Sequence, residues 1–299
     1  MSDASEDAPD ALKMTFWEHT RELGRRLKII LYSVFLLTAL MMILPANLDF
    51  IKNPLEFYDP LIGVILKTVK NQVLPPTVTL VGIEFTAPIE LYFIGSMVLG
   101  VALSIPVVAY EIYKFIGPAL YPHERKSIYP FVTSFTILFV VGAAFGYFVL
   151  APFLIWAMVP FFGVVGAAQF ISVLDFYNIV FITVLFTGFS FTLPIYFILL
   201  VKFNIINTAI VTKNRLYIYA ALYIVCAVMT PDGGPLGDLI LFLPMMALLE
   251  LAVLVGKRYE KGRTSEPRFR IFQSKICRFC GKNTSIDTLF CENCGKSQS

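Results

Sequence analysis

The chain has 299 residues, of which 57% are hydrophobic and only 15% charged, and its mean hydropathy is +0.74. Soluble globular domains are about 45–50% apolar and about 25% charged, so this composition excludes an ordinary soluble enzyme and a disordered chain. The apolar residues come in long blocks, several of which reach the roughly 20 residues that cross a bilayer. The formal net charge of +3 says little as a total, and the placement of the charges along the chain is more informative.

Apolar blocks separated by charge, proline or glycine predict an all-α polytopic membrane protein with six transmembrane helices. The predicted spans are approximately 29–48, 88–116, 128–161, 176–201, 216–229 and 236–255. We expect the last two helices to be short. The fifth offers about 14 apolar residues, or roughly 21 Å of helix against a hydrocarbon core of about 30 Å, and Glu250 interrupts the sixth. A short span thins or tilts the bilayer or requires a partner, unless lipid and flanking side chains absorb the mismatch.

Four of the predicted spans contain a proline, which removes one backbone hydrogen bond and bends a helix. These residues are Pro106, Pro152, Pro194 and Pro244. Bends in four helices predict a curved bundle with a concave face.

The first loop between spans, approximately 49–87, is long and carries apolar residues near helical spacing. Those residues are Leu55, Phe57, Leu61, Ile62, Ile65, Leu66 and Val69. This pattern predicts an amphipathic helix at the membrane interface within the loop.

The distribution of Lys and Arg predicts the orientation of the chain in the membrane. Of the 24 Lys and Arg residues, 21 lie in the N-terminal segment, the second and fourth connections and the C-terminal tail. An even number of spans places all of these on one side, and only Lys52, Lys67 and Lys70 fall on the other. We therefore expect a multi-pass protein of the cytoplasmic membrane with both termini in the cytoplasm. The acidic start of the chain argues against a cleavable signal peptide.

Ionisable side chains at a membrane are candidates for function, because burying them costs free energy unless they are paired or hydrated. No chain of acids and histidines crosses the predicted spans, which argues against an ion-coupled pump. Glu22 and Glu124 share the predicted cytoplasmic face and adjoin basic residues. They either neutralise those neighbours, which contributes little free energy, or bind a cationic ligand through bidentate guanidinium hydrogen bonds. His19 and His123 lie near the two glutamates, and the sequence assigns them no role.

Residues 16–27 (FWEHTRELGRRL) and 115–125 (FIGPALYPHER) are the most distinctive motifs. The first resembles the amphipathic N-terminal motif of the TatC family, the receptor subunits of the twin-arginine protein translocase. The second is similar to that family's first cytoplasmic loop, nearly residue for residue. Shorter stretches at 145–149 and 230–250 resemble the third helix and the last hairpin, so the resemblance extends over roughly residues 14–263.

The resemblance implies a function and a set of site residues. Such proteins bind the twin-arginine signal peptide of a folded precursor at the cytoplasmic face and recruit single-span TatA-type subunits, with transport driven by the proton-motive force. Glu22 and Glu124 match the glutamates that receive the arginine pair, and paired carboxylates can distinguish guanidinium from lysine by fork geometry. The residues that would shape this site are Phe115, Pro118, Leu120 and Tyr121. The polar residues at the family's partner-docking hairpin are Thr230, Asp232 and Asp238.

The chain departs from the family pattern at several positions. Gly24 stands where an Arg is usual, Thr20 where an apolar residue is usual, and Thr192 where many relatives carry an intramembrane Glu or Gln. Asp238 replaces a Gln, which weakens the partner-docking assignment because a carboxylate titrates and an amide does not. We further expect homo-oligomers in the lipid bilayer, no nucleic acid bound to the membrane domain, and no catalytic site.

The composition becomes polar and charged after Lys257. We divide the chain into a polar tail at 1–13, a six-helix membrane domain at 14–260, a linker at 261–274 and a zinc-ribbon-like module at 275–299. Two C-x-x-C pairs, each followed by Gly, predict a structural Zn²⁺ ion with four cysteine ligands. The ligands are Cys277, Cys280, Cys291 and Cys294. An iron site is the residual alternative, and cytoplasmic placement argues against disulfides.

Three functions remain open at this point. The resemblance favours a twin-arginine receptor with an appended zinc ribbon. A small-molecule or ion transporter with a cation site on the cytoplasmic face is a second reading. A membrane-anchored zinc-ribbon adaptor, with the bundle as scaffold only, is a third.

Overall fold

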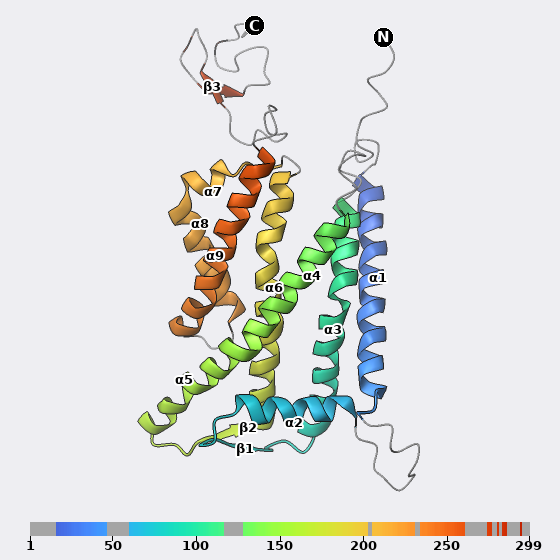
Figure 1. The fold of residues 1–299 in the computed structure, drawn as a ribbon, viewed down its shortest axis with the longest axis vertical. Helices are drawn as coiled ribbons and strands as arrows, with labels where there is room; N and C mark the ends of the chain where they lie inside the picture. The colour runs from blue at the N-terminus through green and yellow to red at the C-terminus, as the bar shows by residue number, and fades with distance from the viewer. Residues whose placement is uncertain are drawn as a thin grey trace.

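The computed structural model describes residues 16–46, 60–116, 128–202, 205–230 and 234–260, and in the tail residues 274–276, 280, 283–285 and 294. The described part is almost entirely helical (Figure 1). The helices are α1 (Phe16–Ile43), α2 (Leu61–Val73), α3 (Ala87–Ile116), α4 (Ile128–Phe145), the π-helical turn η5 (Gly146–Leu150), α5 (Ala151–Val164), α6 (Val173–Lys202), α7 (Ala209–Lys213), α8 (Arg215–Met229) and α9 (Pro235–Glu260). Two short sheets complete it: β1 (Thr79–Val81) pairs in parallel with β2 (Phe170–Ser172), and β3 (Ser274–Ile276) pairs antiparallel with β4 (Asn283–Ser285).

Five helical segments in the described part are long and apolar enough to cross a membrane. They are Trp17–Ile43, Ala87–Phe115, Pro130–Val164, Val173–Lys202 and Pro235–Glu260. The remaining predicted span corresponds to α8, whose 15 residues extend only about 22 Å. The prediction of two short final helices is wrong for α9, which has 26 residues and runs through Glu250 without a break.

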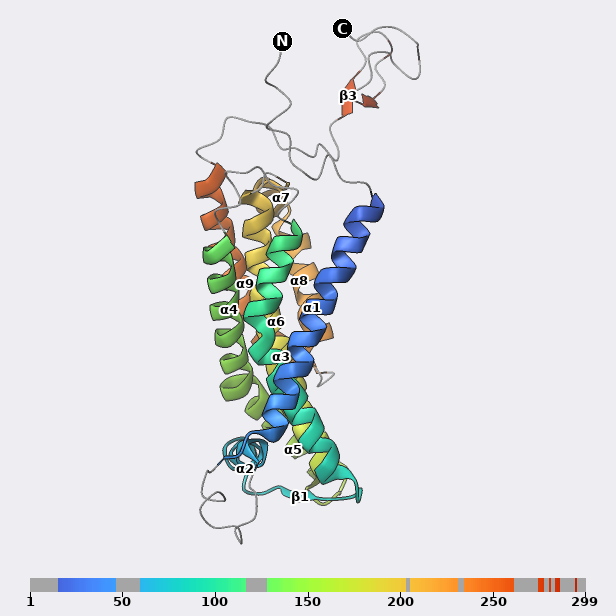
Figure 2. The same cartoon turned by 90° about the vertical axis from the view of Figure 1, so that its right-hand side faces the viewer.

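The first helix begins at Phe16, well before the predicted start of the span at residue 29. The charged N-terminal motif and the apolar block form one continuous helix, because no proline separates them. Helix α1 packs against α3, and Figure 2 shows the two helices crossing. Glycine makes this contact possible, since a Cβ added at Gly100 would lie 2.3 Å from Thr38 Oγ1. The Tyr92 hydroxyl also donates a hydrogen bond to the Met42 carbonyl.

The segment formed by α4, η5 and α5 crosses the bundle obliquely against α6 (Figure 1). Pro152 is the second residue after the π-helical turn, and because it has no N–H, one hydrogen bond of the α-helix is missing there. Pro106, Pro194 and Pro244 lie inside helices, as the sequence predicts. Close approach again depends on glycine, because a Cβ at Gly142 would lie 2.7 Å from the Phe191 side chain.

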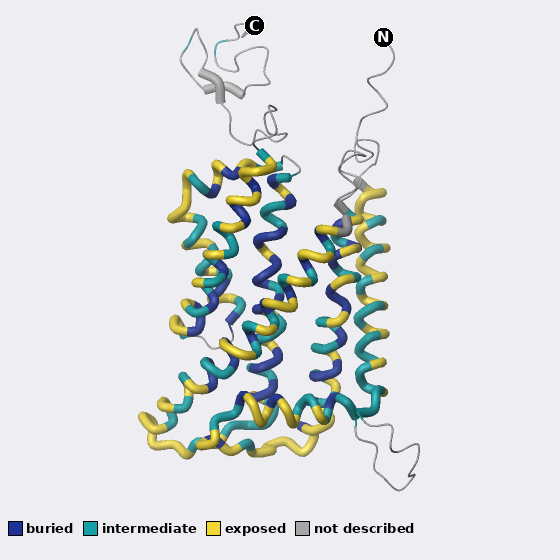
Figure 3. The backbone as a smooth tube through the Cα atoms, in the orientation of Figure 1, coloured by how far each residue is buried: buried dark blue, intermediate teal, exposed yellow. Residues whose placement is uncertain are grey.

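The amphipathic helix predicted in the first loop is confirmed as α2, which lies across one end of the bundle (Figure 1). Its apolar face is buried at Ile62, Val69 and Val73, and the Tyr177 hydroxyl on α6 donates a 2.8 Å hydrogen bond to the Leu66 carbonyl. Leu55 and Phe57 lie outside the described residues. Burial concentrates along α3, α4 and α6, whereas much of α1 is exposed (Figure 3).

The α4–α6 crossing yields a first prediction. Replacing Gly142 with alanine forces the Phe191 ring or the Thr187 carbonyl, 2.8 Å from the new Cβ, to move, and overpacking of this kind costs about 1–3 kcal/mol. We expect the variant to unfold at lower temperature in detergent. Gly24→Ala is the matched control, because no atom lies within 4 Å of its Cβ position and alanine favours helix. Equal melting temperatures for the Gly142→Ala variant and the unmodified chain would contradict the close approach.

Candidate functional site

A guanidinium held between two carboxylates lies where α1 packs against α3. Arg26 donates from Nε to Glu22 Oε1 over 3.1 Å and from Nη1 to Glu111 Oε2 over 3.0 Å, and its Nη2 also contacts Glu22 Oε1. All three side chains are largely buried, with exposed fractions of 13% for Arg26, 17% for Glu22 and 7% for Glu111. This ion-pair cluster carries a net negative charge, since two carboxylates face one cation.

Only one of the two carboxylate oxygens of Glu22 takes part in these hydrogen bonds. Its Oε1 receives both hydrogen bonds from Arg26, whereas Oε2 is buried and has no hydrogen-bond partner among the described residues. A buried acceptor without a partner costs about 1–3 kcal/mol. A donor that reached Oε2 would recover this free energy, so the position favours binding of a further cation.

Phe115, predicted to shape the site, lies beside the same motif. Its ring stacks on that of His19 in α1, with centroids 4.5 Å apart and an angle of 21° between the planes. The last turn of α3 is thereby joined to the first turns of α1. Of the other predicted site residues, Glu124, Pro118, Leu120 and Tyr121 lie outside the described residues.

Two of the three predicted partner-docking residues contact each other. The Thr230 hydroxyl, just after α8, donates to Asp238 Oδ1 in the first turn of α9 and also lies 3.1 Å from the Cys226 carbonyl oxygen. Both side chains are buried, with exposed fractions of 6% and 9%. The third residue, Asp232, lies outside the described residues.

Two further polar residues in the spans have partners of their own. Glu250 on α9 accepts a hydrogen bond from the Tyr219 hydroxyl and lies 3.4 Å from Arg215 Nη2, so it ties α9 to α8. Thr192 is buried and donates to the Phe189 carbonyl over 2.7 Å, within its own helix.

The predicted metal site is described only in part. Cys280 and Cys294 each lie in a turn and are half-buried, whereas Cys277 and Cys291 lie outside the described residues. Among the described residues, no three metal-binding side chains lie close together. The segment between β3 and β4 contains the first C-x-x-C pair, an arrangement that fits a metal-binding hairpin.

Sequence reasoning did not identify the roles of Arg26 and Glu111. Arg26 follows Glu22 by four residues, a spacing that brings two side chains together on a helix. Glu111 is an acid near the end of an apolar span, which by itself calls for a cationic partner. The partner could not be chosen from sequence, because it lies 85 positions away on another helix.

Long apolar helices around a buried carboxylate–guanidinium cluster define a multi-pass membrane protein with a polar site near one end of its bundle. The sequence pattern of the family described as Sec-independent protein translocase protein (TatC) matches residues 18–244. The chain therefore belongs to the TatC family, and its role is in protein translocation across a membrane.

Relatives and solved structures agree with this assignment. The TatC protein of Escherichia coli K12 is 34% identical over 61% of this chain and 69% of its own length, and that of Haemophilus influenzae is 32% identical over 63% and 73%. TatCy of Bacillus subtilis is 25% identical over 85% of this chain and 93% of its own length. Two crystal structures of the twin arginine translocase receptor TatC share the fold. Their TM-scores are 0.63 and 0.64 at 24% and 25% identity, and they cover 81% and 80% of this chain and 100% and 99% of their own.

The ion-pair cluster yields a second prediction. Arg26→Gln leaves Glu22 and Glu111 facing each other without a full counter-charge, and removing one member of a buried ion pair costs about 3–5 kcal/mol. Glu111→Gln should destabilise the protein less, because Arg26 still forms an ion pair with Glu22. We expect the double variant to be more stable than the sum of the two losses predicts. Thermal unfolding in detergent measures all three, and strict additivity would contradict the coupling.

Proposed function

We propose that the chain is the receptor subunit of a twin-arginine translocase and binds the arginine pair of a signal peptide at its cytoplasmic face. The observation that carries the proposal is the buried, unpartnered Oε2 of Glu22, in the N-terminal motif of a TatC-family protein. The solved relatives are known as twin arginine translocase receptors, which supports the same function. A small-molecule transporter and an inert scaffold have no comparable support.

Guanidinium chemistry matches this acceptor. An arginine is always charged and presents its N–H groups in a planar fork, whereas a lysine ammonium is a compact point charge. One signal arginine would donate to Glu22 Oε2, and Glu124 in the loop after α3 would receive the other. The stacked rings of His19 and Phe115 would hold α1 and α3 together while the peptide binds.

Arg26 would act as an internal substitute for a signal arginine. In the structure its guanidinium binds both Glu22 and Glu111. When the signal peptide binds, the Arg26 guanidinium would remain bound to Glu111. Its contact with Glu22 could then be kept or given up to the incoming arginine. The site would therefore never hold two unpaired buried carboxylates, a state that costs several kcal/mol.

The Thr230–Asp238 pair would form part of a docking site for TatA-type single-span subunits. Helix α8 is shorter than a hydrocarbon core by roughly 8 Å, so it would thin the bilayer or recruit a partner helix beside it. A polar residue in the transmembrane helix of such a subunit would contact the Thr230–Asp238 pair. In this arrangement α8 also spans the membrane as the fifth of six helices, both termini are cytoplasmic and the subunit forms homo-oligomers in the cytoplasmic membrane.

The C-terminal segment would bind one structural zinc ion through Cys277, Cys280, Cys291 and Cys294. About 25 residues bury too little apolar surface to fold alone, so a bound metal would supply most of the folding free energy of this module. The module would add stability to the tail and take no part in the chemistry of signal recognition.

Signal binding gives a third prediction. Glu22→Gln removes the charge of the carboxylate that would receive the guanidinium, and charge-assisted hydrogen bonds contribute about 1.5–3 kcal/mol. We expect the affinity for a twin-arginine peptide to fall about 10- to 100-fold, measured by titration of a fluorescent peptide in nanodiscs. A twin-lysine peptide should bind the unmodified chain about 10- to 100-fold more weakly than the twin-arginine peptide does.

The matched control is Glu18→Gln, which makes the same charge change at an exposed residue one helical turn earlier in α1. This variant should retain affinity within about threefold, the change that exposed charges typically cause. Equal binding of the twin-arginine and twin-lysine peptides by the unmodified chain would overturn the receptor proposal.

Metal content gives a fourth prediction. The full chain purified under reducing conditions should carry close to one zinc per chain, and Cys280→Ser should release it because tetrahedral zinc requires all four thiolates. Cys226→Ser is the control, since Cys226 is buried in α8, far along the chain from the module. Elemental analysis that finds no zinc, or iron in its place, would refute the zinc assignment.

A further inference from the structure

A cavity of about 260 Å³ lies between α2, α3, η5 and α6. Its lining is almost entirely apolar and includes Ile65 on α2, Val98 on α3 and Phe181 on α6. Val64 on α2 also lines it and is 43% exposed, so the cavity is open along one side of α2. Helix α2 lies at the opposite end of the bundle from the start of α1, where the ion-pair cluster is found (Figure 1).

The polar side chains that line this α2 cavity form hydrogen bonds to the protein itself. The Thr68 hydroxyl donates to the Val64 carbonyl over 2.9 Å, and the Tyr147 hydroxyl donates to Gln72 Oε1 over 2.6 Å. A buried water molecule needs about two to four polar partners, and apolar cavities stay dry and bind apolar molecules. The lining therefore suits hydrocarbon better than water.

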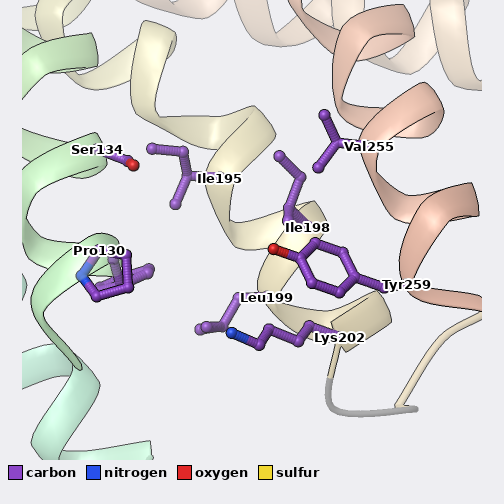
Figure 4. Close-up of a pocket in the computed structure, with 9 residues that line it drawn as sticks. Pro130, Ser134, Ile195, Ile198, Leu199, Lys202, Val255 and Tyr259 are labelled. Carbon is purple, nitrogen blue, oxygen red and sulfur yellow. The ribbon is translucent and has the colours of Figure 1, made fainter. Parts of the chain in front are cut away.

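The absence of charge distinguishes the α2 cavity from a second cavity, between α4, α6 and α9. Lys202 and Tyr259 line the second one, and Figure 4 shows these two side chains extending toward Pro130 on α4. A charged group inside a membrane protein requires a partner or water. No charged side chain is among the described residues that line the α2 cavity, so a fully apolar occupant fits there.

The position of α2 limits what the occupant can be. Helix α2 lies across the end of the bundle (Figure 1), and its amphipathic pattern places it at the membrane interface. A partner helix that crossed the roughly 30 Å hydrocarbon core along this cavity would run into α2. A lipid acyl chain begins at the interface and extends inward. The lining reaches Val184, seven residues after Tyr177, whose hydroxyl contacts α2, so the cavity extends about 10 Å inward from α2.

We propose that this cavity binds one acyl chain of a phospholipid from the leaflet in which α2 lies. The chain would enter beside Val64 and Thr68 and pack against Val98. The phosphate would lie at the polar side of α2, where Lys67 is exposed one turn after Val64. An empty cavity leaves its lining without van der Waals contacts on one side, so the bound chain would complete the packing of α2 on the spans. The proposal is independent of signal recognition, because none of these residues belongs to the ion-pair cluster.

Photolabelling tests the proposal with the full chain in phosphatidylcholine vesicles that contain a phosphatidylcholine with a diazirine on one acyl chain. After illumination, mass spectrometry locates the adducts by residue. Leu99 and Val184 line the cavity, Leu138 and Leu185 do not, and all four are half-buried. We expect several-fold more adducts at the lining pair, because a bound chain stays in contact with it. Equal labelling of the two pairs would overturn the proposal by showing only the lipid that surrounds any helical bundle.

A variant that fills the cavity locates the source of the labelling. Val98→Phe places a larger side chain in the cavity and should reduce the adducts at Leu99 and Val184 to the level of Leu138. Val140→Phe makes the same change at a 58% exposed residue of α4 that does not line the cavity, and it should leave the labelling unchanged. Undiminished labelling in Val98→Phe, or an equal loss in both variants, would refute the proposal. Even if Val98→Phe fails to fold, the comparison of the two residue pairs in the unmodified chain decides the question.

Discussion

A solvent that neither donates nor accepts hydrogen bonds is the constraint on which the structure depends. In lipid, polar groups must find partners within the chain, and the described helices show how this is done. Arg26 binds two glutamates, Asp238 receives the Thr230 hydroxyl, and Thr192 bonds within its own helix. Against this background, the unpartnered Oε2 of Glu22 is informative, because it is the one carboxylate oxygen among the buried unpartnered side-chain atoms of the described residues.

The arrangement of helices along the chain could be predicted because hydropathy and periodicity are local properties. The apolar blocks located five long helices, and the spacing of apolar residues located α2. The start of α1 was wrong because a helix continues through charged residues until something breaks it, and Gly24 alone does not. The prediction of a short sixth span, based on the interruption of its apolar run at Glu250, was wrong because glutamate favours helix and α9 continues through it. The carboxylate contacts Tyr219 and Arg215 on α8.

The sequence could predict only those site residues that belong to a local motif, and not their partners on other helices. Resemblance pointed to Glu22 and Phe115, and both lie where α1 meets α3. The pairing of Arg26 with Glu111 joins positions 85 apart, on two helices that also approach closely at Gly100. No pattern in a single sequence encodes that approach.

Charge balance explains why the proposed receptor site needs an acid from outside the described helices. Glu22, Arg26 and Glu111 carry two negative charges and one positive, so one incoming guanidinium completes neutrality. An arginine pair brings two, and a second cation without a counter-charge is costly at a site that is mostly buried. A further carboxylate is therefore required, and Glu124 is the residue that the loop motif supplies. A lysine pair would satisfy the same charge balance but lacks the planar fork, so selectivity for arginine would have to come from the geometry of the hydrogen bonds at Glu22, and charge would set only the strength of attraction.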